Sequence, residues 1–208
     1  MDRVSTSDSV LDQSASALLA DLASRRLSAE ALMVATVDRI AERNPAVNAV
    51  VGLADPGALL AQARALDAGP VMGPLHGLPL AIKDLVNVQG IRSTRGSPIF
   101  ADFVPESDDV LAARLRASGA ILIGKTNVPE FGLGSHTFNP VYGRTNNPYN
   151  PARTCGGSSG GAGVALALGM VALADGSDMM GSLRNPAAWS NVYGFRPSWG
   201  RVPAEPAQ

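Results

Sequence analysis

Cysteine, histidine and aromatic residues are scarce in this chain, which has one cysteine, two histidines and 5% aromatic residues among 208 positions. The single cysteine, Cys155, has no partner for a disulfide within the chain, a pattern that fits a reducing compartment. So few aromatic rings argue against a stacking platform for nucleobases. The composition therefore favours neither a disulfide scaffold nor a nucleic-acid-binding surface.

An excess of charge and a long apolar run are also missing. The 17 basic and 18 acidic residues give a formal net charge of −1, which leaves no electrostatic footprint for nucleic acid or an anionic membrane. The longest small apolar run, residues 162–174, falls short of the ~20 apolar residues that span a bilayer. The first residues lack the basic and apolar regions of a signal peptide. We expect a soluble, cytoplasmic protein without nucleic-acid or membrane partners.

Amphipathic helices are indicated in the first third of the chain, where apolar residues recur at helical spacing. The predicted helices cover residues 14–25, 29–42 and 57–66. Ser28 is a typical N-cap for the second helix, and Asn44 followed by Pro45 predicts its end, because the residue before proline avoids the helical region. We expect residues 1–70 to form an N-terminal helical segment that packs on a core made by residues 71–208.

A strand, a helix and a second strand are predicted in the core. A short apolar strand covers residues 78–86, a helix begins at Ser107 and ends near Gly119, and a buried strand covers residues 120–124. This order favours an α/β fold with a right-handed crossover. The long polar stretch at residues 137–154 is typical of a functional loop.

The densest motif is the glycine- and serine-rich segment at residues 155–163, which reads Cys-Gly-Gly-Ser-Ser-Gly-Gly-Ala-Gly. A linker is disfavoured because an apolar segment follows directly, and a phosphate loop because the required Lys and Ser/Thr are missing. Residues 156–160 match the nucleophile elbow, but that fold needs a histidine downstream of the serine. Because His76 and His136 both lie upstream, a serine here needs a different base.

Lys83 is a candidate base, since it lies within an apolar strand where burial would favour the neutral amine. A lysine that extends to the strand edge, or that pairs with Asp84, is the alternative. A second small-residue turn presents Ser182 shortly before a predicted helix start at Pro186. Its backbone N–H groups suit the binding of an anion, although a capped helix N-terminus explains the same pattern.

Together these segments resemble the amidase signature family. The resemblance rests on Ala-Ile-Lys-Asp at residues 81–84, Gly-Gly-Ser-Ser-Gly-Gly at residues 156–161 and Gly-Ser-Leu-Arg at residues 181–184. Supporting matches lie at residues 73–79, 124–131, 147–148 and 194–197. The resemblance spans roughly residues 73–203 and implies a mixed sheet flanked by helices.

The resemblance also implies an amide hydrolase with a Ser-Ser-Lys triad. Ser182 corresponds to the nucleophile that forms the acyl-enzyme, and Ser158, which follows a cis peptide bond after Gly157, corresponds to the serine that relays the proton. Lys83 corresponds to the base that accepts this proton and returns it to the leaving amine. The family implies a small-molecule amide as substrate and no metal or organic cofactor.

The resemblance further implies an oxyanion hole made by the backbone N–H groups of Met179, Met180 and Gly181. The family usually carries glycine at the position of Met180. A methionine would be strained there if the backbone required a positive φ. If it does not, Met179 and Met180 place flexible apolar bulk near the acyl site.

Length is the main departure from the family, whose enzymes continue with further strands and helices. We expect a truncated sheet whose open edges and apolar faces invite a partner, either a second copy or the missing C-terminal half. Two alternatives to an active amidase stay open. One is an inactive fragment, and the other is the amidase-like subunit of a tRNA-dependent amidotransferase.

Overall fold

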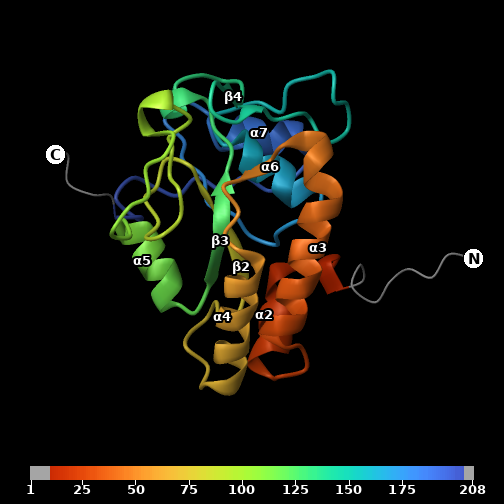
Figure 1. The fold of residues 1–208 in the computed structure, drawn as a ribbon. Helices are drawn as coiled ribbons and strands as arrows, with labels where there is room; N and C mark the ends of the chain where they lie inside the picture. The colour runs from red at the N-terminus through yellow and green to blue at the C-terminus, as the bar shows by residue number, and fades with distance from the viewer. Residues whose placement is uncertain (1–9, 204–208) are drawn as a thin grey trace, which may run out of the picture.

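The structure, a computed structural model, describes residues 10–203 (Figure 1). The elements in chain order are α2 (Ala15–Ala23), α3 (Ala29–Val47), β1 (Val50–Val51), α4 (Pro56–Ala68), β2 (Pro79–Lys83), η1 (Pro98–Phe100), α5 (Val110–Ala117), β3 (Ile121–Thr126), η2 (Glu130–Gly132), β4 (Phe138–Asn139), β5 (Gly143–Arg144), α6 (Gly160–Ala167) and α7 (Arg184–Trp189). No helix within residues 10–203 is long and apolar enough to cross a membrane.

A mixed sheet with strand order β1-β3-β2 lies at the centre of the fold, with α3 and α5 on opposite sides of it in Figure 1. β2 runs parallel to β3, and β1 runs antiparallel to β3. Ala174 forms a parallel bridge to Ala81, so the segment after α6 lies along the other edge of β2. The predicted α/β fold with helices around a mixed sheet is confirmed.

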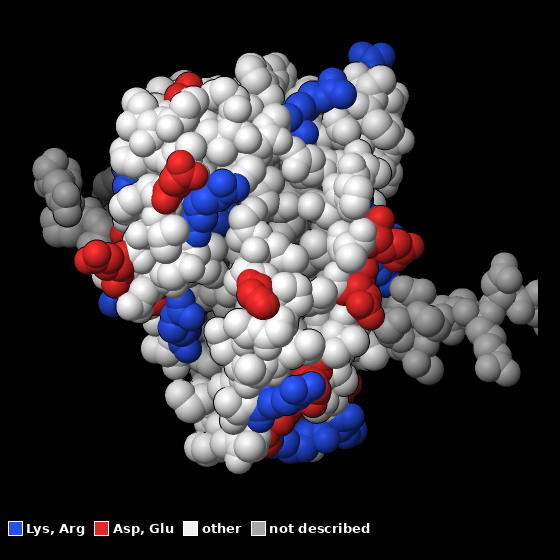
Figure 2. All heavy atoms as spheres, in the orientation of Figure 1, with Lys and Arg blue, Asp and Glu red and all other residues white. Residues whose placement is uncertain are grey.

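One hydrophobic core joins the helices to the sheet. It includes Leu18 of α2, Leu32 of α3, Leu59 of α4, Ile82 of β2 and Ile123 of β3, all nearly inaccessible to solvent. Every residue of β2 and β3 is buried, because helices or loops cover both faces of these strands. Charged side chains, in contrast, are scattered over the face shown in Figure 2 without a continuous patch of either sign.

The predicted end of the second helix was wrong, because α3 continues through Pro45 to Val47. Asn44 supplies the reason, since its side-chain oxygen accepts 2.8 Å hydrogen bonds from two backbone N–H groups just beyond the helix. Asn48 then ends α3 in the left-handed conformation with φ of 53°. These local bonds stabilise a last turn in which proline removes only one N–H donor.

The start of α5 also differs from the prediction, because the helix begins at Val110 rather than three residues earlier. The carboxylates of Asp108 and Asp109 accept 2.7 Å hydrogen bonds from the backbone N–H groups of Gln89 and Asn87. These side chains therefore tie down the loop after β2 instead of extending the helix. The predicted strand-helix-strand unit is confirmed, with Gly119 just past the helix end at φ of 90°.

Gly161 supports a prediction about stability, because α6 crosses the end of β3 at this residue. A methyl group at Gly161 would come within 2.3 Å of the Asn127 backbone nitrogen and 2.6 Å of the Ala49 carbonyl oxygen. We expect Gly161→Ala to lower the thermal unfolding midpoint by about 5–10 °C, since overpacking against backbone typically costs ~1–3 kcal/mol. Gly57→Ala in α4 is the control, because its added carbon meets only ordinary contacts. Equal midpoints for the two variants would contradict the close approach.

Candidate active site

Lys83 ends β2 in the interior of the protein, with 1% of its surface exposed. Its Nζ donates hydrogen bonds of 2.8 Å to the hydroxyl oxygens of Ser158, Ser159 and Ser177. The amine therefore has three hydroxyl partners and direct contact with the serine loop. The structure brings together two residues of the predicted triad, Lys83 and Ser158.

The glycine- and serine-rich segment forms a buried turn that leads into α6, which excludes a flexible linker. Ser158 and Ser159 are buried, and the peptide bond between Gly157 and Ser158 is cis, as the family resemblance implied. A side chain at Gly157 would come within 2.9 Å of the backbone nitrogen of His136. The tight packing that glycine permits holds the Ser158 hydroxyl against the Lys83 amine.

Asp178 organises the second turn, which precedes α7. Its carboxylate accepts a 2.8 Å hydrogen bond from the Gly181 N–H and a 3.2 Å hydrogen bond from the Arg184 N–H. The Arg184 side chain donates to the same carboxylate at 2.9 and 3.1 Å. The Arg184 guanidinium thereby holds the pKa of Asp178 well below its usual range, and the turn keeps a fixed negative charge.

Ser182 lies half-buried in this turn. Its carbonyl oxygen accepts a 2.9 Å hydrogen bond from the Ser159 N–H, which joins the two serine segments through their backbones. Within residues 10–203, no hydrogen bond links the hydroxyl of Ser182 to that of Ser158. The structure therefore places Ser182 beside the serine loop. The two hydroxyls do not form the hydrogen bond that a proton relay between them needs.

Met179 and Met180 precede Ser182 in this turn and are each 87% exposed. Met180 is not one of the described residues with positive φ, so the position occupied by glycine in the family causes no left-handed strain here. Of the three predicted oxyanion-hole donors, the Gly181 N–H is bonded to Asp178. The two methionines therefore add apolar surface beside Ser182 without distorting the backbone.

The electrostatic environment of Lys83 favours loss of its proton. Burial lowers the pKa of Lys83 from 10.5 to about 8, and the charges of Asp175 and Asp178 offset part of this effect. Asp175 also accepts a 2.7 Å hydrogen bond from the backbone N–H of Lys83. Near pH 7 a larger fraction of the Lys83 amine is therefore neutral than for an exposed lysine.

The two alternative interpretations of Lys83 are wrong. The side chain does not extend to solvent at the strand edge, because it is buried. It does not pair with Asp84 either, since the Asp84 carboxylate accepts hydrogen bonds from Thr94 and lies 3.8 Å from the amine of Lys125. Lys83 is the last residue of β2, whereas Asp84 begins the turn that follows it. Within residues 10–203, no group of three His, Cys, Asp or Glu side chains is arranged to hold a metal ion.

Sequence reasoning missed three groups around Lys83, namely Ser159, Ser177 and Asp175. Ser159 directly follows Ser158, whereas Asp175 and Ser177 lie a few residues before the turn that presents Ser182. The signal that could have found them is the number of hydrogen-bond donors on a lysine amine, which is three when the amine is charged. A single relay serine leaves such an amine with unsatisfied donors.

A mixed sheet that presents a buried lysine to a glycine- and serine-rich loop is the architecture of the amidase signature enzymes. The chain belongs to this family, since the sequence model named Amidase matches residues 31–208. The resemblance inferred from the motifs is therefore confirmed.

Three similar proteins illustrate the relationship, and each of them is longer than this chain. A glutamyl-tRNA(Gln) amidotransferase subunit from Azoarcus sp. (strain BH72) is 44% identical over 196 residues, which is 93% of this chain and 40% of that protein. The structure of a bacterial aryl acylamidase of the amidase signature family matches with a TM-score of 0.85 and 35% identity, over 93% of this chain and 41% of that one. Fatty acid amide hydrolase matches with a TM-score of 0.85 and 30% identity, over 90% and 34% of the two chains. The chain thus spans less than half the length of these relatives.

Proposed function

We propose that this protein hydrolyses a carboxamide to a carboxylate and ammonia or an amine, through an acyl-enzyme on Ser182. The observation that carries the proposal is the buried amine of Lys83, 2.8 Å from the Ser158 hydroxyl, in a chain of the amidase family. A neutral amine in this position serves as a general base where histidine is missing.

In the proposed mechanism, neutral Lys83 takes the proton of Ser158 as Ser158 takes the proton of Ser182. The Ser182 oxygen attacks the amide carbonyl carbon, and the tetrahedral intermediate collapses as the proton returns to the leaving nitrogen. Water then attacks the ester carbonyl by the same route and releases the carboxylate. The mechanism requires the Ser182 side chain to turn toward Ser158.

The oxyanion of the intermediate is proposed to be bound by the backbone N–H groups of Met179, Met180 and Gly181. Gly181 contributes once its bond to Asp178 opens. One such donor is typically worth about 3 kcal/mol in the barrier. The exposed apolar side chains of Met179 and Met180 suit an apolar or aryl acyl group as the small-molecule substrate.

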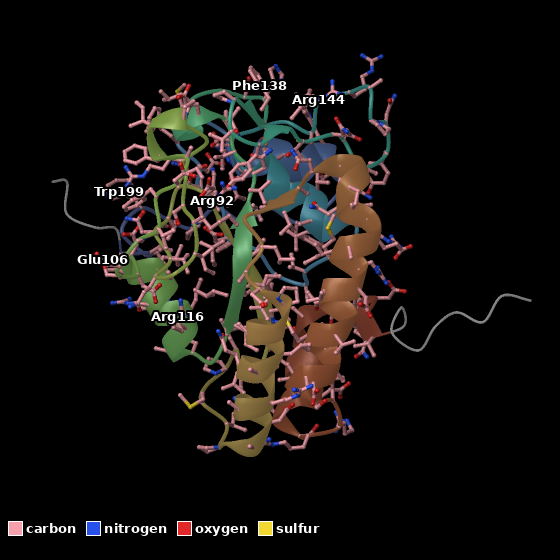
Figure 3. All side chains as sticks on the ribbon, in the orientation of Figure 1. Arg92, Glu106, Arg116, Phe138, Arg144 and Trp199 are labelled. Atoms are coloured by element: carbon pink, nitrogen blue, oxygen red, sulfur yellow. The ribbon has the colours of Figure 1, made fainter. Side chains whose placement is uncertain are left out.

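The alternative function is that of a subunit in a tRNA-dependent amidotransferase. It is favoured by relatives 43–45% identical to this chain that are named as subunits of glutamyl-tRNA(Gln) amidotransferase. Both functions fit a partner polypeptide, either a second copy or the part that the longer relatives carry. Large apolar side chains near the end of the described chain are freely accessible, such as Trp199 at the edge of the molecule in Figure 3.

The proposed function is tested by active-site labelling and by product analysis. A fluorophosphonate probe is expected to form one adduct per chain, which peptide mapping places on Ser182. Release of an arylamine from an aryl amide supports the amidase, whereas release of ammonia only from glutamine supports the alternative function in an amidotransferase. An adduct on Ser158 would exclude the proposed nucleophile. So would the absence of any adduct on a sample whose cooperative thermal unfolding shows that the chain is folded.

A further inference from the structure

The chain has only two lysines, Lys83 and Lys125, beside 15 arginines. Both lysines are buried, with at most 1% of their surface exposed, and both lie at the carboxyl end of the central strands. An arginine keeps its proton when it is buried, whereas a lysine can lose it. Both buried basic residues of the sheet are thus lysines, whose protonation state depends on their surroundings.

Lys125 is held on the face of the sheet opposite to Lys83. In the register of the parallel strands Lys125 pairs with Ile82, and partners in register point to the same side. Its amine donates to the carbonyl oxygen of Val86 and lies 3.8 Å from the carboxylate of Asp84. Lys125 therefore fixes the turn that follows Lys83 from the face of the sheet opposite to the Lys83 side chain.

Asp175 connects the two lysines electrostatically. It lies at the edge of β2 and accepts the backbone N–H of Lys83 at 2.7 Å. Burial raises the pKa of Asp175, the hydrogen bond from Lys83 opposes this, and the charges of Lys125 and Lys83 lower it further. Ala174 pairs with Ala81, so Asp175 lies level with Ile82, the residue that pairs with Lys125 on the other side of β2. The strand register therefore places this one carboxylate beside both lysines.

We propose that Lys125 is a positioning residue for Lys83: it neutralises Asp84, shares Asp175 with Lys83, and so frees the amine of Lys83 to act as a base. This inference rests on the proposed function of Lys83. Without Lys125, Lys83 would be the principal cation facing Asp175, and its protonated form would be favoured. The charged groups that act on the two amines are Asp175 and Asp178 for Lys83, and Asp84, Asp175, Asp109 and Asp108 for Lys125.

Because the chain has two lysines, labelling with ¹³Cε-lysine gives two resonances, and Lys125→Met leaves the resonance of Lys83 alone. We expect the titration midpoint of Lys83 to lie near pH 8 in the unsubstituted chain and about one pH unit higher in Lys125→Met. The rate of fluorophosphonate labelling at pH 7 should fall about tenfold, since the neutral fraction of Lys83 falls by that factor.

The double variant Lys125→Met/Asp84→Asn separates electrostatics from structure. It removes the unpaired buried carboxylate that destabilises the single variant, so its thermal midpoint should recover. The raised midpoint of Lys83 should persist, because Asp175 still lacks its second cation. An unchanged Lys83 midpoint in both variants overturns the inference. This result is distinct from failure of the proposed function, because the NMR titration requires no activity.

Discussion

Replacing Ser182 with alanine is expected to abolish fluorophosphonate labelling and to lower amide hydrolysis at least about 10⁴-fold, the scale on which serine hydrolases lose activity without their nucleophile. The fold should tolerate this change, since the bond between the Ser159 N–H and the carbonyl of residue 182 uses only backbone atoms. The loss would therefore report the missing oxygen. The measurement is adduct formation by intact mass, together with the thermal unfolding curve.

Two further variants make the Ser182 result specific. Ser198→Ala changes an exposed serine outside the segments that carry Ser158 and Ser182 and should label at the unsubstituted rate. Ser158→Ala removes the proposed relay hydroxyl but keeps the proposed nucleophile, so labelling should be slow and still located on Ser182. Labelling that persists in Ser182→Ala would assign the nucleophile to another residue, with Ser158 the first to examine.

Replacing Lys83 with methionine should lower the labelling and hydrolysis rates by about 10²–10⁴-fold, the usual contribution of a general base. The pH dependence should change as well. Lys83 accepts a proton only when neutral, so the rate should rise with pH through about 8 in the unsubstituted chain and lose this rise in Lys83→Met. A rate that instead fell as the pH rose through 8 would mean that the charged amine is the active form.

Lys83→Arg is the matched comparison for charge. A guanidinium occupies a similar position but keeps its proton throughout this pH range, so it should not restore activity. Restored activity would show that Lys83 provides only a positive charge. The Lys83 amine donates hydrogen bonds to three serine hydroxyls, so a substitution can also disturb the packing of the site. The thermal midpoints of both variants must therefore stay close to that of the unsubstituted chain for the rates to report on the base.

Much of the fold was predictable because its signals are local. The buried strand β3, the glycine after α5 and the serine N-cap of α3 each depend on neighbours within a few residues. The error in the predicted start of α5 arose where a group distant in the sequence bonded to a residue that was expected to act locally. Asp109, at the N-cap of α5, accepts a hydrogen bond from Asn87 in the loop after β2 instead of capping the helix, and no pattern near Asp109 encodes that contact.

The sequence by itself determined the chemistry that this protein has available: a lysine in an apolar strand, two serine turns after it, and no histidine downstream. It also determined the family, because these segments occur in a fixed order. Only the tertiary structure decided that Lys83 meets three hydroxyls, that Asp84 pairs with Lys125, and that Ser182 joins the serine loop through its backbone. The physical reason is that a buried charge takes its partners from whichever segments the sheet and α6 bring to the same strand ends, and these segments lie up to about a hundred residues apart.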